Sequence, residues 1–206
     1  MRATPADDRL IVVGLRNPGA DYRGSRHNVG EEVVRALAEE LSFRRAPKRL
    51  LAEIVETDLE GHPVVLALPT TFMNESGGPI SGLIKYFGIT ASNLVLVHDD
   101  IDLPFGKLRF HFGRGAGGHN GVASAMRSLG SRDVWRLKIG VGRPPGRMDP
   151  ADFVLRRFSP GERGDVDLLV AEGADTLRRF AAGGGEEAQQ FAGEATRRLG
   201  IARDEA

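Results

Sequence analysis

Short apolar runs alternate with amphipathic segments along most of this chain. Residues 9–15 (RLIVVGL) and 94–97 (LVLV) are almost continuously apolar, which is typical of strands buried on both faces. Residues 107–112 alternate polar and apolar side chains, as a half-buried strand does. We predict further strands near residues 51–57, 64–68 and 135–141.

Helical spacing appears between these strands. Apolar side chains three and four positions apart predict a helix over residues 29–41. Residues 76–87 are also predicted to be helical, because the proline at their start is tolerated in a first turn. Further helices are predicted over residues 121–129 and from Pro160 onward, with an interruption at 183–185 (GGG).

Strands that alternate with helices predict one α/β domain with a largely parallel or mixed sheet. We place this domain at residues 9–200 and expect residues 1–8 and 201–206 to be flexible tails. The first eight residues are polar and include Pro5, unlike a signal peptide, and no apolar run is long enough to span a bilayer. The expected location is therefore the cytoplasm.

The composition excludes several kinds of nucleophile and metal site. The chain has no cysteine, which excludes disulfides, cysteine nucleophiles and cysteine metal sites. It has no G-x-S-x-G segment, so a serine nucleophile on a strand-to-helix elbow is not indicated. An activated water molecule is the nucleophile that these absences favour.

The charge is unevenly distributed, although the formal net charge is zero. Residues 103–148 contain nine lysines and arginines but a single acid, Asp133, which is an excess of eight positive charges. Such asymmetry indicates a polyanionic partner on one face. The alternative is that these side chains are simply solvated on the surface of the fold.

The residues best suited to catalysis follow predicted strands, where sites form in α/β sheets. His27 lies in the glycine-containing loop after the first strand, and Asp99 lies two positions after residues 94–97. A carboxylate that binds a histidine fixes its tautomer and allows it to take a proton from water near neutral pH. We therefore predict a His27–Asp99 pair, against the alternative that both residues are structural.

Three asparagines, Asn17, Asn74 and Asn120, occupy turns or glycine-flanked loops. An uncharged amide can hold a peptide or donate to an oxygen that gains charge during a reaction. The alternative for each one is that asparagine favours turns.

Residues 113–118 match the G-x-G-x-x-G pattern of dinucleotide-binding loops. The segment lies in mid-chain, however, and no acid ends the following strand. It is not a phosphate-binding P-loop either, because His119 follows Gly118 where lysine is required. We expect its glycines to allow close backbone packing beside Asn120.

Several of these segments together resemble the bacterial-type peptidyl-tRNA hydrolase family, at similar spacing from about Leu10 to the C-terminal helices. The matching segments are residues 13–19 (VGLRNPG), Tyr22, 26–30 (RHNVG), 69–77 (PTTFMNESG), 98–104 (HDDIDLP), 117–121 (GGHNG) and 136–144 (RLKIGVGRP).

This resemblance implies a single, usually monomeric α/β domain with a twisted mixed β-sheet flanked by helices. The implied activity is hydrolysis of the ester between a peptide and tRNA, which recycles tRNA from stalled or dropped-off translation without a metal or other cofactor. The resemblance implies a catalytic role for His27, Asp99 and Asn17, of which Asn17 senses the peptide. The positions that match substrate contacts are Tyr22, Phe72, Met73, Asn74 and Asn120.

The chain departs from the family pattern at three positions. Arg16 replaces a glycine beside Asn17, which is expected to alter the loop backbone, and Ser25 replaces a common threonine. His111 stands where lysine or arginine is expected to meet a tRNA phosphate. The predicted phosphate contacts are Arg109, His111, Arg114 and Lys138.

Two other functions remain open from sequence. One is an RNA-binding relative that has lost turnover. The other is a metal-dependent phosphohydrolase with ligands from His98, Asp99, Asp100 and Asp102, although adjacent residues on a strand point to opposite faces. Sensitivity to a chelator separates this second alternative from a His–Asp hydrolase.

Overall fold

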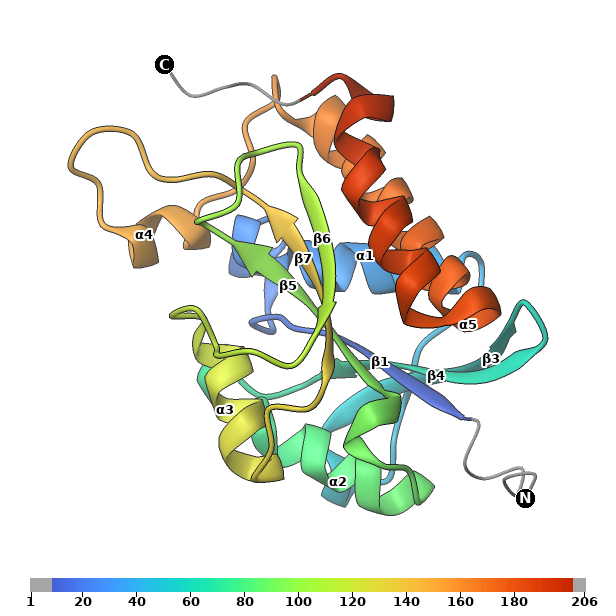
Figure 1. Cartoon of the computed structure of the whole chain (residues 1–206). Coiled ribbons are helices and arrows are strands. Elements are labelled where there is room, and N and C mark those ends of the chain that lie inside the picture. Colours follow the sequence, from blue (N-terminus) through green and yellow to red (C-terminus); the bar gives the residue numbers. More distant parts are fainter. Residues whose placement is uncertain (1–8, 202–206) are drawn as a thin grey trace.

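The computed structural model describes residues 9–201 and contains one seven-stranded mixed sheet (Figure 1). The spatial order of the strands is β2-β3-β4-β1-β5-β7-β6. The strands are β1 (Leu10–Gly14), β2 (Arg44–Arg45), β3 (Ala52–Leu59), β4 (His62–Pro69), β5 (Leu94–Asp100), β6 (Leu108–Phe112) and β7 (Trp135–Gly140).

The four central strands are parallel, with β1 between β4 and β5, and β7 beside β5. The outer strands are antiparallel to their neighbours: β3 to β4, β2 to β3, and β6 to β7. The predicted mixed α/β sheet is therefore confirmed. Because the central strands run the same way, their carboxyl ends share one edge of the sheet, where a site can form.

Helices cover both faces of the sheet (Figure 1). Helices α1 (Val29–Ala38) and α5 (Arg163–Leu199) pack on one face, and α2 (Gly77–Phe87) and α3 (Asn120–Leu129) pack on the other. Successive β1 side chains serve opposite faces: Val12 packs with the first pair of helices and Val13 with the second. This two-sided burial explains why the run that forms β1 is continuously apolar.

Helix α5 is two helices joined at a kink, as the glycine interruption predicted. Gly184 has φ 80° and ψ −167°, which no α-helix accommodates. The second half folds back along the first, so that Arg198 Nη2 lies 2.6 Å from Glu172 Oε2.

The structure differs from the predicted elements at a few places. Helix α1 ends at Ala38 rather than near residue 41, because Glu39 adopts a positive φ of 53°. Strand β5 continues to Asp100. The short strand β2 and the helix α4 (Pro150–Leu155) were not predicted, although Asp149 followed by proline is a helix-start signal: Asp149 Oδ1 accepts from Ala151 N at 2.8 Å.

The expected flexible tails, residues 1–8 and 201–206, lie outside the described residues except for Ile201, which is buried. Within residues 9–201, no helix has the length and apolar character needed to cross a membrane.

Helix α1 meets the sheet through backbone-to-backbone contact. A Cβ added to Gly30 would lie 2.1 Å from the carbonyl oxygen of Val97 on β5. One added to Gly14 on β1 would lie 2.6 Å from the carbonyl oxygen of Gly30. Only glycine allows this approach. The close contact fixes the segment just before α1, which includes His27, beside the carboxyl end of β5.

We predict that Gly30→Ala lowers the free energy of unfolding by about 1–3 kcal/mol or more, because the new methyl group overpacks a rigid backbone contact. Denaturant unfolding measures this change. The matched control is Gly78→Ala in the first turn of α2, where an added Cβ meets no atom within 4 Å. Equal stability of the two variants would show that α1 does not depend on this contact.

Candidate active site

A cavity of about 560 Å³ opens at the carboxyl edge of the sheet. One wall comes from α4 and the residue before it, through Asp149, Pro150, Ala151, Val154 and Leu155. Six residues predicted from sequence line the same cavity: Asn17, His27, Met73, Asn74, Asp99 and Asn120. Segments far apart in the chain thus converge as expected from their positions at strand ends.

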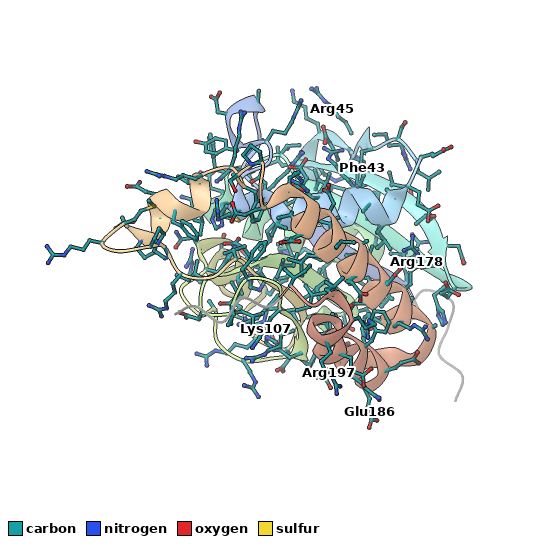
Figure 2. All side chains as sticks on the ribbon, turned by 90° about the horizontal axis from the view of Figure 1, so that it is seen from above. Phe43, Arg45, Lys107, Arg178, Glu186 and Arg197 are labelled. Atoms are coloured by element: carbon teal, nitrogen blue, oxygen red, sulfur yellow. The ribbon has the colours of Figure 1, made fainter. Side chains whose placement is uncertain are left out.

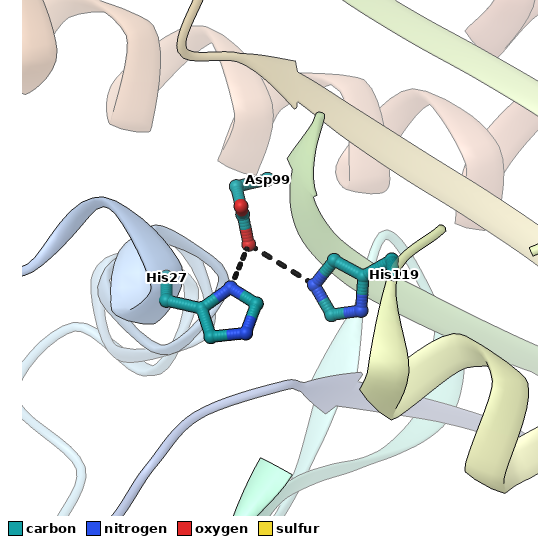
Figure 3. Close-up of side chains that lie close together, drawn as sticks. All are labelled: His27, Asp99 and His119. Atoms are coloured by element: carbon teal, nitrogen blue, oxygen red, sulfur yellow. Dashed lines mark hydrogen bonds and ion pairs between the residues drawn. The ribbon is translucent and has the colours of Figure 1, made fainter. Parts of the chain in front are cut away.

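Asp99 binds two histidines through a single oxygen (Figure 3). Its Oδ1 lies 2.8 Å from His27 Nδ1 and 3.0 Å from His119 Nε2. The rings of the two histidines are 4.8 Å apart between centroids. The predicted His27–Asp99 pair is present, and His119 extends it to a three-residue cluster.

Three different elements position this cluster. Asp99 is the penultimate residue of β5 and is only 2% exposed. His27 belongs to the 3-10 helix η2 (Arg26–Asn28), which leads directly into α1. His119 is the N-cap of α3, where its Nδ1 accepts from the backbone N–H of Val122 at 3.3 Å.

These hydrogen bonds define the tautomers of both imidazoles. A backbone N–H can only donate, so His119 Nδ1 carries a lone pair, and its Nε2–H donates to Asp99. Asp99 as a carboxylate can only accept, so His27 donates Nδ1–H to it. In the neutral ring, the Nε2 of His27 then keeps its lone pair, which is the state that a general base requires.

Asp99 remains ionised despite its burial. Burial alone would raise the pKa of this carboxyl, but electrostatic attraction to His27 and His119 and their hydrogen bonds outweigh it. The pKa of Asp99 consequently lies well below its ordinary value. Next to it, burial and the neighbouring His119 hold the pKa of His98 well below its ordinary value, so this histidine is neutral at neutral pH.

Asn17 is held on both sides by hydrogen bonds. Asn28 grips its backbone: Asn28 Oδ1 accepts from Asn17 N, and Asn28 Nδ2 donates to Asn17 O, each at 2.9 Å. The Asn17 side chain accepts from Met73 N through Oδ1 at 2.8 Å. Its NH₂ group is therefore left as the donor that Asn17 can offer to the cavity.

The other predicted substrate contacts occupy different depths. Met73 is buried, whereas Asn74 and Asn120 are exposed at the cavity. Tyr22 and Phe72 do not line it; their rings meet edge to face at 6.3 Å, and Phe72 is 51% exposed. These two form an aromatic pair available to a flat ligand outside the cavity.

The predicted phosphate contacts divide into two kinds. Arg109 and Arg114 are exposed, and neither has a carboxylate partner within residues 9–201. Lys138 Nζ lies 2.6 Å from Oδ2 of Asp100, which itself lines the cavity. His111 is a poor candidate, because it is buried, and burial together with Arg136 and Lys138 lowers its pKa to about 4, which leaves it uncharged.

The glycine-rich loop has a different role from the one expected. Gly113, Gly117 and Gly118 have positive φ values, and Cβ atoms added there would meet no atom closer than 3.9 Å. The glycines therefore serve the conformation of the loop, and the expectation of close packing was wrong. The loop is fastened instead by Arg136, a fully buried residue whose guanidinium donates to the carbonyl oxygens of Gly113 and Gly115.

The acids proposed as ligands of a phosphohydrolase metal do not converge. Asp100 pairs with Lys138, and Asp102 pairs with Arg143. Among the described residues, the one group of at least three side chains close enough to share a metal ion is His27, Asp99 and His119. One nitrogen of each histidine, Nδ1 of His27 and Nε2 of His119, already donates a proton to Asp99, so this arrangement suits a hydrogen-bonded acid–base cluster.

Sequence reasoning missed three contributors to the site: His119, Asn28 and the α4 wall. A histidine between a glycine-rich loop and a helix start was the signal for His119. The Asp-Pro pair was the signal for α4. No local pattern indicates that Asn28 hydrogen-bonds the backbone of Asn17, because that contact depends on the packing of α1.

Comparison with known proteins gives a consistent result. A family model described as peptidyl-tRNA hydrolase matches residues 11–198. The peptidyl-tRNA hydrolase of Kineococcus radiotolerans is 48% identical over 192 residues, covering 89% of this chain and 96% of its relative. That of Mycobacterium tuberculosis is 45% identical over 181 residues, covering 87% and 95% respectively.

Solved structures agree with the sequence matches. The crystal structure of peptidyl-tRNA hydrolase from Acinetobacter baumannii superimposes with a TM-score of 0.83 at 28% identity, covering 91% of this chain and 95% of that one. Matches in sequence and in three dimensions thus extend over nearly the whole described chain. The chain belongs to the peptidyl-tRNA hydrolase family.

Proposed function

We propose that this chain is an esterase that hydrolyses the bond between tRNA and a peptide or N-blocked amino acid, and so recycles tRNA from stalled or dropped-off translation. The observation that carries the proposal is the hydrogen bond from His27 Nδ1 to Asp99 Oδ1 at the cavity. It leaves Nε2 of His27 as a base and requires no metal ion.

In the proposed reaction, His27 Nε2 takes a proton from a water molecule whose oxygen attacks the ester carbonyl. The tetrahedral intermediate then collapses, and the ribose oxygen leaves with the proton from the imidazolium. The products are the free hydroxyl of tRNA and the carboxylic acid of the peptide, which then loses its proton to solvent. The negatively charged Asp99 stabilises the transient imidazolium of His27 inside a buried site.

Neutral amides complete the site. The NH₂ group of Asn17 is available because its oxygen is bound to Met73 N, so Asn17 can donate to the substrate carbonyl or to the developing oxyanion. Asn74 and Asn120 can hold the peptide backbone at the same cavity. A free aminoacyl group offers no second carbonyl to such donors, which provides a physical basis for selecting blocked substrates.

His119 acts through Asp99 in this scheme. Its Nε2–H occupies one lone pair of Oδ1, and its other nitrogen is fixed by the N-terminus of α3. The carboxylate is thereby oriented toward His27. His119 is thus a positioning residue.

We propose that tRNA phosphates lie along the side of the cavity that carries Arg109, Arg114 and Lys138. The Lys138–Asp100 pair connects this basic surface to the cavity. Exposed arginines without carboxylate partners can release counterions on binding a polyanion. The pair of exposed Phe72 and half-buried Tyr22 is proposed to stack on a base at the end of the RNA. We also propose that the enzyme acts as a monomer in the cytoplasm, where translation supplies the substrate.

We predict that His27→Ala and Asp99→Asn each lower kcat/KM by about 10²–10⁴-fold, since each removes the activated base. The measurement is peptide release from an N-acetyl-aminoacyl-tRNA in excess EDTA. The matched control is His62→Ala, a histidine at the opposite end of β4 from the cavity.

Unchanged turnover by His27→Ala would refute the base assignment. Binding of tRNA without release by the wild type would favour an RNA-binding relative that has lost turnover. Activity that disappears only in EDTA would favour a metal-dependent enzyme.

We predict that charge reversal at Arg109 or Arg114 raises KM and reduces the slope of log KM against log salt by about 1 for each phosphate that the variant no longer binds. The control is Arg45→Glu, which changes the net charge equally at an exposed position on β2, the opposite edge strand from β6. Figure 2 shows Arg45 well separated from Lys107, which precedes β6. The same salt slope in all variants would mean that this surface does not bind the RNA.

A further inference from the structure

Arg16 is buried directly after β1, where its long side chain was expected to disturb the Asn17 loop. The structure shows otherwise. Arg16 does not have a positive φ, so its backbone is ordinary for a residue with a side chain. Its guanidinium is engaged by groups on three other elements of the fold.

The three contacts of Arg16 use different nitrogens. Nε donates to the carbonyl oxygen of Pro69 at the end of β4 at 2.9 Å. Nη1 donates to Glu31 Oε1 on α1 at 2.6 Å, and Nη2 donates to Glu53 Oε2 on β3 at 3.0 Å. The guanidinium therefore ties the end of β1 to β4, α1 and β3 at once.

Two of these contacts continue to Asn17. Glu31 Oε2 accepts from Asn28 Nδ2 at 3.3 Å, and Asn28 holds both the N–H and the carbonyl of Asn17. On the other side, Pro69 begins the segment that ends at Met73, whose N–H binds the Asn17 side chain. Arg16 thus fixes both the backbone and the side-chain partner of Asn17.

The charges in this network balance. Glu31 and Glu53 are matched by Arg16, whose side chain is 9% exposed, and by Arg35, which covers Glu31 from the solvent side and is 47% exposed. Arg35 also lies 3.9 Å from Glu53, so removal of Arg16 would leave Arg35 as the one remaining cationic partner of both carboxylates among the described residues. Arg35 donates to Glu31 and, within residues 9–201, has no hydrogen bond to Pro69.

We propose that Arg16 is a positioning residue that aims the donor amide of Asn17 at the peptide part of the substrate. The proposal rests on the function proposed above for Asn17. Arg16 does not contact the substrate itself, because its charged group is enclosed by Glu31, Glu53 and Pro69. Its effect reaches the reaction through the placement of another residue.

The test compares Arg16→Met with Arg35→Met, which removes the other guanidinium from Glu31. We expect Arg16→Met to lower kcat for N-acetyl-aminoacyl-tRNA by about ten- to a hundredfold with little change in KM, since misplacement of a group by about 1 Å has effects of this size. Arg35→Met is expected to stay within about twofold of wild type. Arg16→Lys keeps the charge but cannot reach three partners, and serves if the methionine variant fails to fold.

Hydrogen exchange gives a second readout that does not depend on catalysis. The Met73 N–H is protected by Asn17 Oδ1, so Arg16→Met should accelerate its exchange by about tenfold or more, whereas Arg35→Met should not. If Arg16→Met accelerates exchange of the Met73 N–H but the wild-type protein does not hydrolyse N-acetyl-aminoacyl-tRNA, the network is supported and the proposed function is rejected. Unchanged exchange and unchanged kcat, with only a lower unfolding temperature, would overturn the proposal and leave Arg16 a purely stabilising residue.

A double variant tests whether the link runs through Glu31. Glu31→Ala cuts the connection between Arg16 and Asn28, so Arg16→Met/Glu31→Ala should lose no more kcat than Arg16→Met alone. If the double variant instead lost as much kcat as the two single variants combined, the two residues would act separately, which would contradict the proposed route.

Discussion

The hydrogen bonds to Asp99 Oδ1 are the interaction on which the site depends. A carboxylate that is 2% exposed is costly to keep charged unless donors satisfy it. His27 and His119 supply those donors from two segments that meet only in the folded protein. The carboxylate in turn fixes the proton of each ring, so the same contacts that make its burial tolerable also set up the base.

This arrangement places strict demands on the surrounding backbone. The 3-10 helix with His27 reaches Asp99 because α1 contacts β5 through Gly30 without an intervening side chain. His119 reaches the same oxygen because it caps α3, with its orientation fixed by Val122 N. Small displacements of either helix would therefore change the chemistry of the cavity even where no active residue is altered.

The site separates its charges by depth. Inside the cavity, the ionised Asp99 is matched by two imidazoles, and the asparagines provide uncharged donors for a peptide. The cations lie farther out, where Lys138 is paired and Arg109 and Arg114 are exposed. A substrate with an uncharged acyl group at one end and a polyanion at the other fits this distribution.

Much of the fold and part of the candidate site could be predicted from sequence, because the strands and helices follow local patterns. The apolar runs located β1 and β5, and Asp99 followed from its position at a strand end. Contacts that depend on packing could not be found in this way. The sequence placed Arg16 beside Asn17, but only the folded chain brings Glu31, Glu53 and Pro69 around it. Helix α4 was missed because six residues are too few for periodicity to be visible.

The most direct test of this mechanism is the position of the protons on the histidines, which ¹⁵N NMR of the imidazole nitrogens measures at neutral pH. We expect His27 to carry its proton on Nδ1, with Nε2 bare, and His119 to carry its proton on Nε2. In Asp99→Asn the preference of His27 for the Nδ1 proton should be lost. A wild-type His27 with its proton on Nε2 would contradict the mechanism, since that nitrogen could not accept a proton from water.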